Sequence, residues 1–145
     1  MPLTADADAM KVIVCLDDKG GMLFNNRRQS RDRVLNADVI DMARGSRLCI
    51  EPYSKLLFED SAAEVLCDAD FLNLAKDGDY CFVENRALTS YVDKIEEVVI
   101  YRWNRRYPTD VFFDLDLPKE GFKMSSSEDF VGYSHDKITK EVFRR

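Results

Sequence analysis

The residues whose types and spacing suggest chemistry lie close together near the N-terminus. In the stretch 20–36, four arginines fall within seven positions: Arg27, Arg28, Arg31 and Arg33. Their guanidinium groups suit an anion or phosphate pocket at the start of a helix. Asp32 lies among them, and a partly buried carboxylate can bind an amidine-like N–C–N edge through two hydrogen bonds. A plainer interpretation is also open, in which the arginines form a solvated turn and Asp32 stabilises the helix start.

Other polar residues give weaker indications. Asp114 and Asp116 could chelate a metal, but without histidines or a glycine-rich loop a solvated strand end is the better interpretation. His135 is the only histidine, which excludes a His-rich zinc site and the metallohydrolases built on one, and we expect no metal. We expect His135 at a strand edge or turn, without a partner. No two cysteines have the C-x-x-C spacing, so buried free thiols are expected at Cys15, Cys49, Cys67 and Cys81.

The composition limits the function classes. The 145 residues carry a net charge of −6 with a pI of about 4.8, which argues against broad nucleic-acid binding because that relies on basic residues neutralising phosphates. No apolar run approaches the roughly 20 residues that span a bilayer, and the first residues do not resemble a signal peptide, so we expect a cytoplasmic protein without membrane contact. We expect one domain over residues 10–145. A small polar arm precedes it, residues 1–9, which is disordered or foreign to the natural chain.

The apolar pattern alternates between strands and helices. A helix is predicted from a capping residue, Ser30 or Asp32, to about Ala43, and shorter helices over 70–76 and 87–93. Strands are predicted at 11–16, 47–51, 64–67, 80–84, 96–103, 110–115 and 137–145. The polar run MSSSED, 124–129, is predicted to be a loop. The pattern indicates an α/β fold with a mixed, mostly parallel sheet, helices on both faces and an antiparallel C-terminal edge.

Three segments, in this order, resemble dihydrofolate reductase. The first is KVIVCLDDKGGM, a strand and glycine-containing loop ahead of a helix that begins with an aspartate. The second is YVDKIEEVVIYRW, in which a helix ends and the next strand begins. The third is the closing strand in GYSHDKITKEVFRR. Together they touch about half of residues 10–145, and their order and spacing carry the resemblance.

The resemblance implies a dihydrofolate-reductase-like sheet and an NADPH-dependent reduction of dihydrofolate or a related pteridine. Asp32 would be the catalytic carboxylate that binds the pterin ring and assists its protonation. The same resemblance, together with the basic loop, makes Arg27, Arg28, Arg31 and Thr109 the expected substrate contacts. Ser54 and Asn85 are the polar residues present where the family binds its cofactor.

Two departures weaken that cofactor site. The family contacts the NADPH phosphates through a Gly-Arg-x-Thr run, which is EPYSK at 51–55 in this chain. A later Gly-Gly pair, which lets the backbone approach the cofactor, is replaced by Glu84 and Asn85. Glu51 and Glu84 place negative charge where phosphates bind, which is unfavourable without a counter-charge. The sequence is therefore that of a short, divergent relative without the usual NADPH-binding motifs, and NADPH binding stays open.

Three functions follow from these observations. The first is a degenerate dihydrofolate-reductase-like protein that binds a small planar or anionic ligand near the Arg-rich loop. The second is an active NADPH-dependent reductase of dihydrofolate or a related pteridine. The third is a protein-interaction domain. The expected partner is a small-molecule ligand, and the chain is expected to be a monomer or a homodimer.

Overall fold

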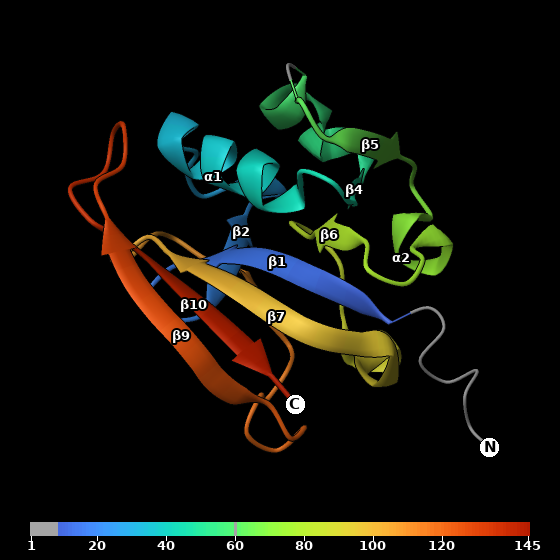
Figure 1. Ribbon diagram of the computed structural model, residues 1–145. Coiled ribbons are helices and arrows are strands. Elements are labelled where there is room, and N and C mark those ends of the chain that lie inside the picture. Colours follow the sequence, from blue (N-terminus) through green and yellow to red (C-terminus); the bar gives the residue numbers. More distant parts are fainter. Residues whose placement is uncertain (1–8, 60) are drawn as a thin grey trace.

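A seven-stranded sheet forms the centre of the molecule. The computed structural model describes residues 9–59 and 61–145, and within them the strand order is β5-β4-β6-β1-β7-β10-β9 (Figure 1). The strands are β1 (Met10–Leu16), β4 (Arg47–Ile50), β5 (Glu64–Cys67), β6 (Tyr80–Phe82), β7 (Ile95–Arg102), β9 (Lys123–Phe130) and β10 (Ile138–Arg144). The first five pair in parallel, and β10 pairs antiparallel with both β7 and β9. The predicted mixed sheet with an antiparallel C-terminal edge is confirmed.

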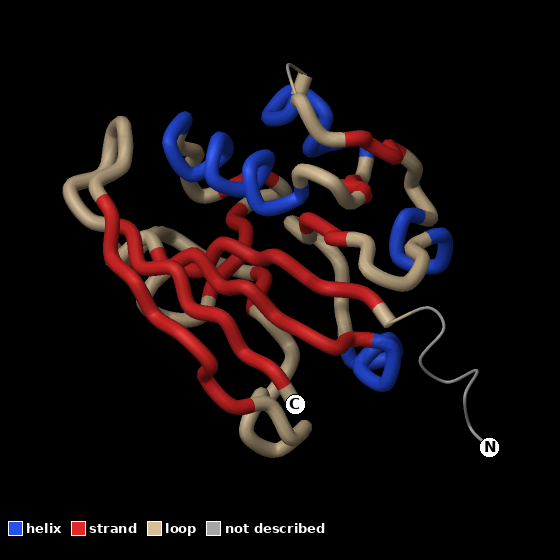
Figure 2. The backbone as a smooth tube through the Cα atoms, viewed as in Figure 1, coloured by secondary structure: helices blue, strands red, loops and turns tan. Residues whose placement is uncertain are grey.

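The central strands β1, β4, β6 and β7 are largely buried because helices cover this part of the sheet on each side. Side chains alternate along β1, so Val12 and Val14 enter one apolar cluster while Ile13 enters the other. The first cluster includes Phe71 of α2 (Phe71–Leu74), and the second includes Leu35 of α1 (Arg33–Ala43). Two 3₁₀ helices complete the covering elements, η2 (Pro52–Phe58) and η3 (Thr89–Lys94) (Figure 2).

Helix α1 begins and ends close to the predicted residues. Asp32 is its N-cap, and the side chain accepts hydrogen bonds from the backbone N–H groups of Val34 and Leu35. The apolar positions Leu35, Val39 and Ala43 recur at helical spacing and are buried. Gly45, which follows the helix, has a φ of 86° that suits glycine.

The Arg-rich stretch is partly a β-hairpin instead of the predicted loop. Strands β2 (Gly21–Phe24) and β3 (Arg27–Arg28) pair antiparallel, and β8 (Val111–Phe112) extends them to a small second sheet. Asn25 and Asn26 connect the two strands with φ angles of 54° and 60°, as a type I′ turn requires at both central positions. The hairpin fixes the direction in which the following residues, up to Asp32, enter α1.

One loop prediction and one strand prediction were wrong. Residues 124–129 form most of β9 instead of a loop, since this polar run is an exposed edge strand that pairs only with β10 on one side. Residues 110–115 contribute only the two residues of β8, which belong to the small sheet. The predicted arm, 1–9, lies outside the described residues apart from Ala9. No helix among the described residues is long and apolar enough to cross a membrane.

Candidate functional site: buried carboxylates at the carboxyl ends of the strands

Buried carboxylates follow three neighbouring strands of the sheet. Asp17 comes directly after β1, Glu51 after β4 and Glu84 two residues after β6, and their exposed fractions are 0%, 3% and 8%. Because β1, β4 and β6 run parallel, these side chains are at the same edge of the sheet. The carboxyl ends of parallel strands are where α/β sheets commonly bind ligands.

Asp17 organises the connection that leaves β1. One carboxylate oxygen accepts hydrogen bonds from the N–H groups of Lys19 and Gly21, and the other accepts from the N–H of Tyr107 at 3.0 Å. Burial alone would raise the pKa of Asp17, but these backbone hydrogen bonds outweigh it and lower the pKa. Asp17 therefore joins the hairpin to the segment after β7.

Glu51 accepts hydrogen bonds from groups that would suit a bound anion. Its Oε2 accepts from the backbone N–H of Asn85 at 3.2 Å and, more weakly, from that of Glu84 at 3.4 Å. Its Oε1 accepts from Arg86 Nη1 at 2.9 Å. Two backbone donors and a guanidinium converging on one carboxylate form the kind of arrangement that otherwise holds a phosphate or carboxylate ligand.

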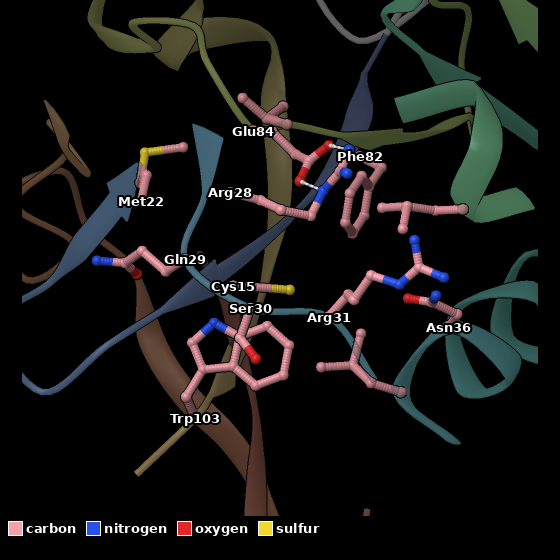
Figure 3. A pocket seen from close by; sticks show the side chains of 13 residues that line it. Cys15, Met22, Arg28, Gln29, Ser30, Arg31, Asn36, Phe82, Glu84 and Trp103 are labelled. Carbon is pink, nitrogen blue, oxygen red and sulfur yellow. Dashed lines mark hydrogen bonds and ion pairs between the residues drawn. The ribbon is translucent and has the colours of Figure 1, made fainter. Parts of the chain in front are cut away.

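Glu84 is held by a second arginine (Figure 3). Its two oxygens accept from Arg28 Nε at 2.8 Å and Arg28 Nη2 at 2.9 Å, a bidentate pair. The buried Ser54 hydroxyl donates a further bond to Glu84 at 2.7 Å. The hydrogen bonds that Arg28 donates to the Glu84 carboxylate raise the pKa of Arg28. Two of the predicted ligand contacts, Arg28 and Ser54, are thus engaged with the protein's own carboxylate.

Asp32 is 2% exposed and has hydrogen-bond donors on both carboxylate oxygens. Oδ1 accepts from the N–H groups of Val34, Leu35 and Tyr133. Oδ2 accepts from the N–H and hydroxyl of Ser134 and contacts His135 Nδ1 at 2.8 Å. The predicted helix-start aspartate is therefore present, and it also ties the 132–135 loop to α1. Its predicted catalytic role toward a substrate stays a prediction, since the groups that now contact the carboxylate are all part of the protein.

The same contacts determine the charge of Asp32. Burial alone would raise its pKa, but hydrogen bonds from the backbone of Tyr133, from His135 and from the backbone of Ser134 outweigh burial and hold the pKa well below its ordinary value. The donors that stabilise the anion are backbone groups and a histidine about 100 positions away along the chain.

His135 lies in the loop before β10, in keeping with the expected strand edge or turn, but it is buried and has partners on both ring nitrogens, so the expectation that it has no partner was wrong. Nδ1 contacts Asp32, and Nε2 lies 3.0 Å from the Ser30 hydroxyl and 3.3 Å from the Tyr107 hydroxyl. Trp103 stacks on the imidazole with ring centroids 4.6 Å apart. These contacts hold the ring in one orientation between α1 and the end of β7.

A small cavity and an open groove adjoin this cluster. The cavity, about 20 Å³, is lined by Ser30, by Arg28 and Glu84, and by apolar side chains that include Leu35, Phe82 and Trp103 (Figure 3). The groove, about 570 Å³, lies over α1 between Leu56 and Tyr133. Three residues line both the cavity and the groove: Arg31, Asn36 and Leu57.

The structure separates the four clustered arginines. Arg28 points into the cavity and pairs with Glu84, while Arg27 is exposed on the hairpin. Arg31 and Arg33 line the groove, and Arg33 lies over the ring of Tyr133 at 4.4 Å. Among the described residues, no carboxylate forms a salt bridge with Arg27, Arg31 or Arg33. Free positive charge therefore remains at the groove.

The other predicted contacts have roles within the fold. Thr109 accepts a hydrogen bond from Gln29 Nε2, and Asn85 donates its backbone N–H to Glu51 while its side chain is exposed. Asp114 caps η3 by accepting from the N–H groups of Leu88 and Thr89. Across residues 9–59 and 61–145, no group of three or more His, Cys, Asp or Glu side chains could hold a metal ion.

Two features of the site were missed by sequence reasoning. Ser30 was considered only as a capping residue, and its contact with His135 joins residues 105 positions apart. Glu51 and Glu84 were recognised as charges, but their partners, Arg86 and Arg28, were not. The one local sign of a counter-charge in the sequence was Arg86, two residues after Glu84.

Comparison with known proteins supports the fold. No model of a protein family matches the sequence, and no curated protein matches it. Among solved structures, the chain is similar to dihydrofolate reductase from Enterococcus faecalis, solved as a complex with NADP(H) and RAB-propyl. The TM-score is 0.69 over 96% of this chain and 97% of that chain, at 7% sequence identity. The chain therefore has a dihydrofolate-reductase-like fold, as its sequence predicted.

Proposed function

We propose that this protein binds a small anionic ligand with a planar or apolar body in the groove beside Arg31. The observation that carries the proposal is the pair Arg31 and Arg33, which line the groove without a salt bridge to any described carboxylate. The groove also offers apolar surface from Ile40, Leu56 and Leu57. A ligand with a carboxylate or phosphate at one end and a flat apolar part at the other complements both features.

NADPH-dependent reduction is the weaker candidate, because the residues at the ends of β4 and β6 do not fit a nucleotide phosphate as they stand. The Glu51 carboxylate already accepts the backbone N–H groups of residues 84 and 85 and the Arg86 guanidinium. Glu84 likewise takes up Arg28 and Ser54. A phosphate would have to displace a carboxylate from its donors and remain close to its charge, which costs free energy.

The alternative function is an active reductase of dihydrofolate or a related pteridine. The observation in its favour is the likeness to a dihydrofolate reductase whose structure contains NADP(H). In that case Asp32 would act on the substrate, with Arg27, Arg28, Arg31 and Thr109 as contacts and Ser54 and Asn85 near the cofactor. It requires Glu51 and Glu84 to leave their arginines when the cofactor binds.

The two candidates are separated by titrating dihydrofolate and NADPH, each alone, against the protein. Trp103 is the only tryptophan and lines the cavity, so its fluorescence reports on ligands that enter from the groove. The proposal expects saturable binding of dihydrofolate, an anionic planar probe, and none of NADPH below millimolar concentrations. Calorimetry with the same ligands removes the contribution of light absorption by the ligand.

The matched variants are Arg31→Ala in the groove and Arg106→Ala, an exposed arginine outside it. Arg31→Ala should weaken dihydrofolate binding about tenfold, corresponding to one exposed charge-assisted contact, and Arg106→Ala should leave it unchanged. Micromolar binding of NADPH, followed by its oxidation in the presence of dihydrofolate, would instead establish the reductase. Equal effects of the two arginine variants would remove the groove as the binding site.

A further inference from the structure

Ser30, His135 and Asp32 form a connected hydrogen-bonded row. The Ser30 hydroxyl lies 3.0 Å from His135 Nε2, and His135 Nδ1 lies 2.8 Å from Asp32 Oδ2. A nucleophilic hydroxyl, an imidazole and a buried carboxylate in this order are the parts of a serine hydrolase, which is recognised by geometry and not by sequence position. We propose that Ser30 is an acyl-accepting nucleophile, with His135 as its general base and Asp32 as the positioning residue.

The tautomer of His135 follows from the ionisation state of Asp32. The carboxylate is ionised because backbone hydrogen bonds stabilise the anion, so it can only accept a hydrogen bond from Nδ1. In the neutral imidazole the proton is then on Nδ1, and Nε2 presents its lone pair to the Ser30 hydroxyl. The Trp103 ring stacked on the imidazole and the Ser134 hydroxyl, 3.3 Å from Nδ1, keep the ring in this position. Tyr107 shares Nε2 at 3.3 Å, a longer contact than that of Ser30.

Two other side chains near the cavity, Cys15 and Ser54, are less suited than Ser30 to attack a carbonyl carbon. Cys15 also lines it, but burial and the nearby Glu84 raise the pKa of its thiol, so the reactive thiolate is suppressed. Ser54 donates its hydroxyl to Glu84 and is completely buried. Ser30 is half-buried, with a base within hydrogen-bond distance and an adjoining cavity.

The surroundings of Ser30 define the class of substrate. The cavity of about 20 Å³ beside it has room for little more than one water or a methyl group, so the acyl group must be short. The groove reaches the cavity at Arg31, Asn36 and Leu57, so the remainder of the substrate would lie along Arg31 and Arg33. An acetyl ester of an alcohol that carries a carboxylate or phosphate matches this arrangement.

Positive charge is available for the oxygen that becomes negative during acyl transfer. Within residues 9–59 and 61–145, the backbone N–H of Arg31, directly after Ser30, donates no hydrogen bond. The N-terminus of the 11-residue helix α1 begins three positions after Ser30. A backbone donor following the nucleophile, near a helix N-terminus, is a common way to stabilise such an oxyanion.

The reaction balances with water as the only co-reactant. Ser30 Oγ forms a bond to the ester carbonyl carbon while its proton passes to His135 Nε2. The bond from that carbon to the alcohol oxygen then breaks, and the alcohol takes the proton from Nε2. Water adds to the acyl carbon, giving a proton to Nε2, and Ser30 leaves with that proton as the carboxylic acid is released. No oxidation or reduction takes place.

The test uses the full chain with a fluorophosphonate probe and with 4-acetoxybenzoate, an anionic acetyl ester. We expect one phosphonyl group per chain on the peptide that contains Ser30, found by mass spectrometry. Hydrolysis of 4-acetoxybenzoate should exceed the buffer rate and fall about 100-fold or more in Ser30→Ala. The matched control is Ser90→Ala, an exposed serine in η3, which should retain labelling and rate. Circular dichroism confirms that both variants fold.

Asp32 is tested through the rate constant of labelling. In Asp32→Asn the imidazole loses the carboxylate that accepts from Nδ1 and holds the ring toward Ser30, so labelling of the folded protein should be slower. A role in folding alone would lower the amount of labelled protein without changing the rate constant. Mapping of the wild-type label keeps the proposal falsifiable even if this variant does not fold. Labelling at another residue, or hydrolysis at the buffer rate in the wild type, overturns the proposal.

Discussion

The cluster around Asp32 and the cluster around Glu51 and Glu84 both bury carboxylates, but their partners differ. Asp32 is held by backbone N–H groups and by His135, whose imidazole can be neutral or protonated. Glu51 and Glu84 are each held by a guanidinium, from Arg86 and Arg28. An arginine stays charged at any physiological pH, so the second cluster can only bind or release anions. The first cluster contains a group that can accept and return a proton, and chemistry is therefore expected there.

The difference predicts which carboxylate the fold depends on most. Asp32→Ala removes the N-cap of α1 and the carboxylate that accepts hydrogen bonds from the backbone of Tyr133 and Ser134. It also removes the hydrogen-bond partner of the buried His135. The free energy of unfolding should fall by about 3 to 4 kcal/mol, because several buried donors lose their acceptor together. Urea denaturation followed by circular dichroism measures this loss.

The control for that variant is Asp41→Ala, an exposed aspartate on the same helix that should change stability by less than about 0.5 kcal/mol. Similar losses for the two variants would mean that the network around Asp32 contributes no more to stability than one exposed aspartate does.

The second cluster should be less costly to disrupt. Glu84→Ala leaves Arg28 without its bidentate partner, but the Arg28 side chain is 18% exposed and can regain water. We therefore expect a loss of about 2 kcal/mol, below the range for a fully buried pair. Removing both partners together, in Glu84→Ala with Arg28→Ala, should cost less than the sum of the two single changes. Additive losses in this double-mutant cycle would show that the pair is not coupled.

Sequence reasoning predicted most of the strands and the start of α1, because these depend on local apolar pattern and capping. It failed at β9, where the polar run 124–129 pairs with β10 although its residues are almost all exposed. The candidate site was only partly accessible from sequence. Asp32 and Arg28 were candidate site residues, but their partners in the structure, His135 and Glu84, lie 103 and 56 positions away. Such pairings arise from chain topology, which no local pattern contains.

A substitution at Gly132 should disturb the cluster around Asp32 with a smaller effect on stability. A Cβ at Gly132 would lie 2.6 Å from Asp32 Oδ2 and 2.9 Å from Ile138 Cδ1, both closer than a normal contact. Gly132→Ala should therefore cost about 1 to 2 kcal/mol, because the loop must move away from the carboxylate. The comparison is Gly78→Ser, where nothing lies within 4 Å but φ is 84°, so only backbone strain acts.

Those two glycine variants separate steric from conformational effects when urea denaturation is combined with Ser30 labelling. Gly132→Ala should slow labelling as well as lower stability, since it displaces the partner of His135. Gly78→Ser should lower stability alone. Unchanged labelling in Gly132→Ala would show that the position of Asp32 does not affect Ser30.

Acid should weaken the fold through the carboxylates that backbone donors stabilise. For Asp32, as for Asp17, burial raises the pKa but hydrogen bonds outweigh it, so the folded-state pKa is lowered. The unfolded chain then binds more protons than the folded one below about pH 4, near the ordinary pKa of aspartate. The stabilisation is complete above that pH and is lost as the pH falls toward the lowered pKa of the folded state. Urea midpoints measured between pH 6 and pH 3 should be flat at first and then decline.

Replacing each of these two aspartates shows how much it contributes to the loss of stability in acid. In Asp17→Asn one backbone-stabilised carboxylate is replaced by a group that does not titrate, so the decline below about pH 4 should become shallower than in the wild type. Asp32→Asn should have the same effect and should in addition slow the labelling of Ser30. A decline as steep as that of the wild type in both variants would mean that other carboxylates determine acid stability. The Asp32 cluster would then be important for chemistry at Ser30 but not for the acid limit of the fold.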